Sequence, residues 1–195
     1  ASVSADNYVD KKVVPNVFPN SPQQTLSVEY EESGAKEGNE LTPTQVHYTP
    51  RVKWEADEGL LYTLMMTDPD APLVSEFLHW LVVNVRGSDL STGKVVASYM
   101  GAGPPEGHGH HRYIFTVWNQ TRSLTPEDYV VPGETASATS LVGRLMFKTV
   151  DYARKITGDP NPTPVAGNFF VAAYDDYVKT LQRHFEMLMR QINEE

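Results

Sequence analysis

Two histidines and one carboxylate stand where apolar runs of the chain begin or end. Asp68 follows one apolar run, and His79 and His111 each precede another. Taken singly, an Asp-Pro pair forms turns and a buried histidine is often structural. If the runs are neighbouring strands, however, the three side chains form a pocket at one end of a sheet. A carboxylate that holds an imidazole raises the imidazole pKa and fixes its tautomer, which makes a hydrogen-bond donor for an incoming anion.

A Gly-Ala-Gly-Pro-Pro-Glu-Gly segment at 101–107 lies between two of the predicted strands. It is not a dinucleotide or phosphate loop, because Glu106 stands where a third glycine is needed and no helix follows. Pro104 and Pro105 also remove two backbone N–H donors. The segment therefore predicts a stiff wall whose glycines permit close approach of a ligand.

Metal binding and catalysis are weaker interpretations of these residues. His79, His111 and Asp68 could form a metal set of two imidazoles and one carboxylate, but the adjacent histidines at 108–111 lie in a Gly-rich loop that we expect to be exposed. The chain has no cysteine. It has no G-x-S-x-G, S-x-x-K or H-E-x-x-H motif, and no nucleophile stands beside a base. We predict binding without catalysis, with a metal-assisted or His/Asp hydrolase as the rival.

Short strand-like runs joined by Gly, Pro and Asp segments must position these residues. They lie at 25–30, 45–48, 51–54, 60–67, 80–85, 95–99, 112–119 and 167–173. Their connections are too short for crossover helices, which favours an antiparallel β-sandwich or barrel. Alternation along 112–119 places Tyr113 on the same face as His111 and Arg112 on the opposite face.

The two ends of the chain differ from this middle. Residues 1–24 are polar and contain three prolines, which predicts an extended N-terminal arm. Helical spacing predicts a helix over 139–156 and another that begins after Asp175 and Asp176. The length of 195 residues is that of a single domain, 1–195.

Net charge limits the partners. The formal charge of -9 repels nucleic acid and anionic lipid surfaces, so we expect no nucleic acid partner and a local site for any anion. No apolar run is long enough to span a membrane, and no signal-like block opens the chain. We expect a cytoplasmic protein, or a secreted one if a signal preceded Ala1. Asn119 begins a glycosylation triplet, a pattern that also arises by chance.

Longer segments resemble the phosphatidylethanolamine-binding protein family. They are DPDAP at 68–72, HWLVVNV at 79–85 and GAGPPEGHGHHRYIF at 101–115, and the similarity continues through LTPTQV at 41–46 and PVAGNFF at 164–170. It covers nearly the whole chain. The resemblance implies an antiparallel β-sandwich with peripheral helices and a C-terminal helix beside a small anion pocket, without a metal or organic cofactor.

The resemblance also implies which residues line that pocket. They are Asp68, His79, Gly103, Pro104, His111 and Tyr113, with Ala71 and Pro72 on one wall and Tyr177 closing the entrance. In the family the pocket holds phosphate, acetate and phospholipid or phosphotyrosine head groups. Family members regulate kinase signalling, chiefly by binding the Raf kinase, and some inhibit serine proteases.

Together these observations predict a binding protein for phosphoryl groups. Imidazolium donors from His79 or His111, the hydroxyl of Tyr113 and backbone N–H groups near Gly103 would hold the phosphoryl oxygens, while Asp68 tunes protonation. The chain departs from the family at one point. The family usually has a longer stretch with Ser and Arg after DPDAP, whereas here Pro72 runs directly into residue 73. Either this loop is shortened or residues are missing from the sequence; the second is expected, because 73–80 resumes the family pattern.

Overall fold

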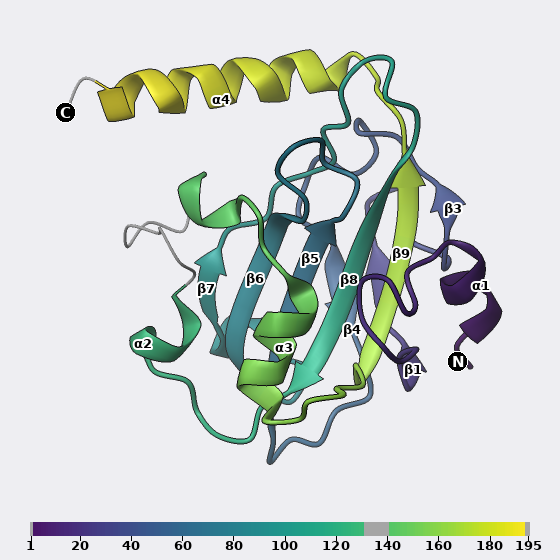
Figure 1. Ribbon diagram of the computed structural model, residues 1–195, viewed down its shortest axis with the longest axis vertical. Helices are drawn as coiled ribbons and strands as arrows, with labels where there is room; N and C mark the ends of the chain where they lie inside the picture. The colour runs from purple at the N-terminus through teal and green to yellow at the C-terminus, as the bar shows by residue number, and fades with distance from the viewer. Residues whose placement is uncertain (1, 131–140, 194–195) are drawn as a thin grey trace.

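A mixed β-sheet runs through the centre of the structure, a computed structural model that describes residues 2–130 and 141–193 (Figure 1). In spatial order its strands are β1 (Gln24–Thr25), β9 (Ala166–Ala172), β8 (His111–Asn119), β5 (Leu61–Asp68), β6 (Phe77–Arg86) and β7 (Lys94–Ala97), and β3 (Asn39–Glu40) also pairs with β9. A two-stranded antiparallel sheet joins β2 (Ser27–Glu29) to β4 (Arg51–Lys53).

The mixed pairing corrects the expectation of an antiparallel β-sandwich, which the sequence predicted as largely antiparallel. The strands from β9 to β7 are antiparallel to their neighbours, as predicted, but β1 and β3 each pair parallel with β9. Parallel partners cannot be joined by a hairpin. They form here because two segments far from β9 in the sequence both run alongside it, a relationship that no local pattern reports.

The strands bury apolar side chains on both faces of the large sheet. On one face Leu64 and Met66 of β5 pack in a core with Val28 and Trp54. On the other face Met65 belongs to a second core. Full burial of such a side chain contributes about 1.5–3 kcal/mol. The alternation along β5 therefore holds a layer on each face of the sheet.

Helices and the N-terminal segment form the layer that covers the second core. Tyr8 of α1 (Ala5–Asp10) and Tyr152 and Ile156 of α3 (Thr149–Thr157) are buried there, and α3 crosses the front of the sheet in Figure 1. The remaining short elements are η1 (Leu90–Thr92), α2 (Pro126–Tyr129) and η2 (Val142–Arg144). Gly158 ends α3 with a φ of 69°, the left-handed conformation that glycine favours at helix ends.

Three predicted elements differ in the structure. The N-terminal arm is helical at α1, where Tyr8 finds a buried position. Residues 45–48 form turns rather than a strand, since Val46 N–H bonds back to Thr42 and Pro43. The helix predicted over 139–156 begins at Thr149 because Phe147 instead exchanges backbone hydrogen bonds with Glu76. The first two residues of that prediction, 139 and 140, lie outside the described residues.

The C-terminal helix α4 (Tyr177–Asn193) crosses one end of the large sheet, at the top of Figure 1. Asp175 begins it by accepting a hydrogen bond from the N–H of Tyr177 at 3.0 Å, as its acidic N-terminal sequence predicted. Val178 is buried, and Leu181 and Phe185 are half-buried on the side toward the sheet. None of the helices in the described ranges is long and apolar enough to cross a membrane.

Candidate functional site

Strand register brings the candidate polar residues to the end of the sheet that α4 crosses. Asp68, the last residue of β5, lies opposite Phe77, the first residue of β6. On the other side of β5, Thr67 pairs with Ile114 of β8, which places Asp68 beside Tyr113. His111 and Tyr113 are two residues apart on β8 and so share a face. The polar residues meet because β5 ends where β6 and β8 begin.

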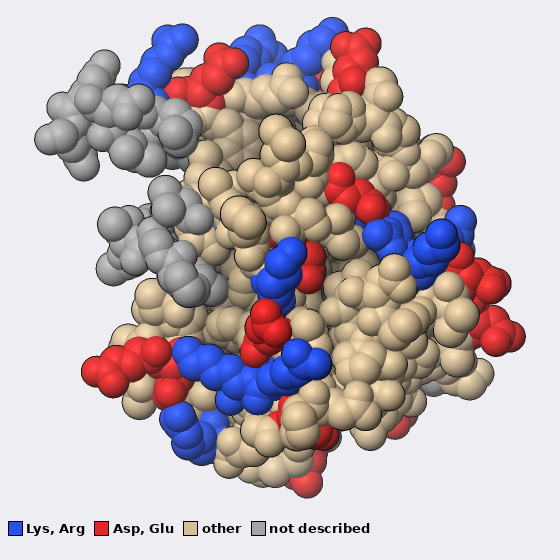
Figure 2. Space-filling view, viewed as in Figure 1, with Lys and Arg blue, Asp and Glu red and all other residues tan. Residues whose placement is uncertain are grey.

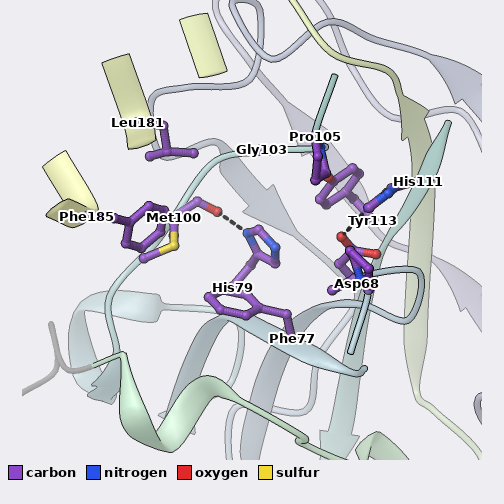
Figure 3. A pocket seen from close by; sticks show the side chains of 12 residues that line it. Asp68, Phe77, His79, Met100, Gly103, Pro105, His111, Tyr113, Leu181 and Phe185 are labelled. Carbon is purple, nitrogen blue, oxygen red and sulfur yellow. Dashed lines mark hydrogen bonds and ion pairs between the residues drawn. The ribbon is translucent and has the colours of Figure 1, made fainter. Parts of the chain in front are cut away.

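A cavity of about 140 Å³ opens at this end of the sheet (Figure 3). A cavity of about 150 Å³ can hold a benzene ring, so this one has room for a small chemical group rather than for a whole lipid. Most of the predicted residues line it, namely Asp68, Ala71, Pro72, His79, Gly103, His111 and Tyr113. Residues 72–74 form a turn at its rim, in which Leu73 is 99% exposed.

Two predicted residues do not line the cavity. Pro104 is buried but does not line the cavity, whereas its neighbours Gly103 and Pro105 do. The ring of Tyr177 instead packs against that of His47, with the two ring centroids 4.8 Å apart. The side chains that α4 contributes come one and two turns later, at Leu181 and Phe185.

Sequence reasoning missed the apolar residues of the cavity: Phe77, Met100, Pro105, Leu181 and Phe185. Leu181 and Phe185 belong to the helical spacing that predicts the last helix, but this spacing does not say which surface the helix covers. The close fit of α4 depends on Gly103, because a Cβ at that position would lie 2.8 Å from Leu181 Cδ2. The cavity thus combines polar groups with an apolar rim.

Asp68 and His111 form a buried pair. His111 Nδ1 donates to Asp68 Oδ2 at 2.8 Å, and the two side chains are 4% and 5% exposed. The second carboxylate oxygen, Oδ1, accepts the N–H of Asp70 at 2.7 Å. Burial disfavours the charged imidazole, but the hydrogen bond and the charges of Asp68 and Asp70 outweigh it, so the pKa of His111 is raised. His111 Nε2 is thereby prepared to donate to a ligand.

His79 differs from His111 in its protonation. Burial, with a smaller contribution from the charge of Arg144, lowers the pKa of His79 to about 4 despite the nearby Asp68 carboxylate. His79 Nδ1 lies 2.8 Å from the carbonyl oxygen of Met100, which can only accept, so Nδ1 carries the proton. The expectation that His79 supplies an imidazolium donor is therefore wrong near neutral pH, because a buried ring with one hydrogen-bonded N–H is more stable uncharged.

Tyr113 is fully buried, and its hydroxyl makes no hydrogen bond of normal geometry within the described residues. Burial, followed by the charge of Asp68, raises the pKa of this hydroxyl well above its usual value. It therefore stays protonated and is available as a donor. A buried hydroxyl without a partner costs about 1–3 kcal/mol, and a ligand oxygen in the cavity would supply that partner.

Two arginines fix the walls without lining the cavity. Arg112 points to the opposite face from His111, as alternation predicted, and its Nη2 contacts Asp70 Oδ1 at 2.9 Å. This pair holds the loop that follows Asp68. Buried Arg144 donates to the carbonyl oxygens of Leu78 and His79, both at 3.1 Å. No sequence pattern had indicated Arg144.

A metal site is not formed by the residues that the structure describes. Among them, no group of three or more His, Asp or Glu side chains could hold a metal ion. His110 instead pairs with Glu40 at 3.0 Å, and the ring of His108 lies 6.1 Å from that of His111. The local chemistry is that of a hydrogen-bonding pocket.

Comparison with known proteins places this geometry in a family. The sequence profile of the phosphatidylethanolamine-binding proteins matches residues 20–170. The chain belongs to the phosphatidylethanolamine-binding protein family. Members of this family are typically binding or inhibitor proteins.

Individual relatives of the chain span most of its length. The putative odorant-binding protein A5 of Drosophila melanogaster is 32% identical over 180 residues, which are 89% of this chain and 82% of the relative. A carboxypeptidase Y inhibitor, solved in complex with its cognate proteinase, has a TM-score of 0.72 at 24% identity and covers 88% of this chain and 95% of its own. A phosphatidylethanolamine-binding protein from Plasmodium vivax has a TM-score of 0.67 at 21% identity, with 89% and 99% covered.

Proposed function

We propose that the chain binds a phosphoryl head group in this cavity without transforming it. The buried hydroxyl of Tyr113 carries the proposal, because it lines the cavity and makes no hydrogen bond of normal geometry within the described residues, while the Gly103 backbone and the Asp68 carboxylate lie near it. His111, held by Asp68, adds a charge-assisted donor at the same place. One acceptor group on a ligand satisfies both donors.

The apolar rim supports a ligand whose head group is attached to something larger. Met100, Leu181 and Phe185 lie together on one side of the cavity, and Asp68, His111 and Tyr113 lie on the other side (Figure 3). A head group therefore fits inside and the first apolar atoms of its substituent fit at the rim. On the face shown in Figure 2, Lys and Arg are interspersed with Asp and Glu, so anion capture depends on this local arrangement.

The test compares two tyrosines that differ in position. Tyr113→Phe removes only the hydroxyl, and we expect it to weaken binding of O-phosphoethanolamine about tenfold in a calorimetric or NMR titration. Tyr48→Phe is the matched control, because Tyr48 is 71% exposed and lies outside the cavity. Equal affinity of the two variants would remove the basis of the proposal.

The biological output that we propose is control of a protein partner, with a kinase of the Raf type as the first candidate. A cavity of this size contacts only a small ligand group, so affinity for the head group alone is modest. A partner that docks around the rim would then be displaced or recruited by the ligand. A pull-down with wild-type protein and His111→Ala measures this, since a partner controlled through the cavity changes its occupancy in the variant.

Protease inhibition is the second candidate. It would use a surface other than the cavity, so inhibition would persist in Tyr113→Phe and His111→Ala. The name of the Drosophila relative adds a third ligand class, odorants, and the apolar rim would contact the apolar part of such a ligand. An uncharged ligand would bind with equal affinity to wild-type protein and Tyr113→Phe unless it accepts the hydroxyl hydrogen bond.

A further inference from the structure

The cavity presents an acceptor as well as donors. Because the carbonyl of Met100 fixes the proton of His79 on Nδ1, the other ring nitrogen, Nε2, carries a lone pair. Within the described chain, the ring makes its hydrogen bond of normal geometry through Nδ1, and the backbone of Gly101 also lies near the ring. Figure 3 shows the Nδ1 edge of the ring turned toward Met100 and the opposite edge turned toward the side of the cavity that holds Asp68, His111 and Tyr113.

The groups packed around His79 keep this edge an acceptor. Asp68 at the end of β5 and His111 and Tyr113 on β8 face it from one side, and Arg144 of η2 lies behind its backbone. Each oxygen of Asp68 already accepts one hydrogen bond, Oδ2 from His111 and Oδ1 from the Asp70 N–H, and the hydroxyl of Tyr113 also lies near this carboxylate. From α4 the neighbours are the apolar Leu181 and Phe185. His79 Nε2 is thus an acceptor in the cavity to which none of these neighbours donates.

A bare phosphoryl anion satisfies only part of this arrangement. Its oxygens accept from Tyr113 Oη and from His111 Nε2–H when that imidazole is charged, but they place lone pairs against His79 Nε2. Opposed lone pairs are repulsive, and a buried acceptor without a donor loses its hydration without replacement. A ligand that keeps one proton on its phosphoryl group matches two donors and one acceptor.

We propose that the cavity selects phosphate monoesters that carry one P–OH, which donates to His79 Nε2 while the remaining oxygens accept from Tyr113 and His111. This inference rests on the proposed function and narrows it, because phosphodiesters have no such proton. When a monoester arrives as the dianion, one proton must be taken up, on the ligand or on His79. Taking up this proton forms one O–H or N–H bond, and the P–O bonds of the ligand neither form nor break.

The experiment compares two probes of equal charge. At about pH 5.5, below the second pKa of a phosphomonoester near 6, methyl phosphate is mainly a monoanion with one P–OH, and dimethyl phosphate is a monoanion without one. We expect wild-type protein to bind methyl phosphate about tenfold more tightly, because sites built for a hydrogen bond reject the analogue that lacks it. Inorganic phosphate, titrated alongside, should bind no more tightly than methyl phosphate if the ester is the ligand class.

Substituting His79 distinguishes a preference due to the P–OH hydrogen bond from one due to the larger size of dimethyl phosphate. His79→Asn can turn its amide to donate rather than accept, so we expect the two probes to bind within about threefold of each other. His184→Asn, on the exposed side of α4, keeps the tenfold preference. Calorimetry in buffers of different ionisation enthalpy at about pH 7.5 should show more proton uptake with methyl phosphate than with dimethyl phosphate.

The outcomes distinguish a failure of this inference from a failure of the proposed function. If dimethyl phosphate binds wild-type protein as tightly as methyl phosphate, or if the preference survives in His79→Asn, the inference is wrong and the head-group pocket stands. If inorganic phosphate binds much more tightly than methyl phosphate, the ester part of the inference is wrong. If none of the phosphates binds and Tyr113→Phe matches Tyr48→Phe, the proposed function fails and the inference fails with it.

Discussion

Glu76 and Thr149, which lie 73 positions apart, join the segment before β6 to the first residue of α3. Thr149 Oγ1 donates to Glu76 Oε1 at 2.5 Å, and the Thr149 N–H points at both carboxylate oxygens at 3.2 and 3.3 Å. A carboxylate at a helix N-terminus satisfies an N–H that has no partner within the helix. This bond holds α3 against the strand that carries Phe77 and His79.

The first prediction concerns this bond. Thr149→Val keeps the shape of the side chain but removes the hydroxyl, so Glu76 stays buried with one donor fewer. We expect the free energy of unfolding to fall by about 1–2 kcal/mol in urea titrations. Thr180→Val, at an exposed position of α4, is the control and should stay within about 0.5 kcal/mol of wild type. A loss no larger than that of the control would show that the bond contributes nothing.

The second prediction follows from the raised pKa of His111. A histidine whose pKa is higher in the folded state stabilises the fold fully below its unfolded value near 6.5, and this stabilisation is lost as pH rises through the folded pKa. Stability should therefore fall above about pH 6.5. Asp68→Asn removes the charge that raises the pKa and should flatten this slope, whereas Asp10→Asn, an exposed change, should not. An unchanged slope in Asp68→Asn, measured by urea unfolding, would contradict the role of the pair.

The third prediction concerns His79, for which the free energy of unfolding should change with pH in the opposite direction. Its folded pKa of about 4 lies below the unfolded value of 6.5, so its stabilising effect is present above 6.5 and is lost as pH falls toward 4. At about 1.4 kcal/mol per pKa unit, the loss approaches roughly 3 kcal/mol. His79→Gln should reduce this acid sensitivity in unfolding measurements between neutral pH and pH 4. The lowered pKa of His79 and the raised pKa of His111 together predict that the free energy of unfolding is largest near pH 6.5. A free energy of unfolding that only rises or only falls with pH would contradict one of the two pKa shifts.

The fourth prediction tests the contact between the glycine loop and α4. A Cβ at position 103 would lie 2.8 Å from Leu181 Cδ2, the movable end of a side chain. Gly103→Ala should therefore change stability by less than about 1 kcal/mol but displace Leu181 at the rim and weaken binding of phenyl phosphate several-fold. The double change Gly103→Ala with Leu181→Ala should restore the affinity. If the double variant binds no better than Gly103→Ala, the two residues are not coupled through this contact.

Local patterns predicted the antiparallel strands β5, β6 and β8 and the last helix, because alternation and helical spacing are properties of short segments. They also placed Arg112 and Tyr113 on opposite faces. The parallel pairing of β1 and β3 with β9 could not be predicted in this way, since it depends on segments more than 120 positions apart. The same is true of the helix start at Thr149, which is set by Glu76.

The site shows the same division. The resemblance to the family motifs identified most of the polar residues that line the cavity. It did not predict the protonation state of either histidine. The difference between His79 and His111 arises from partners outside the motifs, a carbonyl of Met100 for one and the Asp68 carboxylate for the other. The displacement of the α4 contribution from Tyr177 to Leu181 and Phe185 depends on where the helix crosses the sheet, which side-chain periodicity does not specify.

The small volume of the cavity has a consequence for how the protein is used. Under the proposed function, the cavity contacts one chemical group of a ligand and leaves the rest of that ligand, its carrier, in solvent. Discrimination between carriers must then come from whatever touches the surrounding surface, such as Leu73 at the rim. Evolution can thus change which carriers a member of this family recognises by altering the turn at 72–74 or the outer part of α4, while the chemistry at the bottom stays the same.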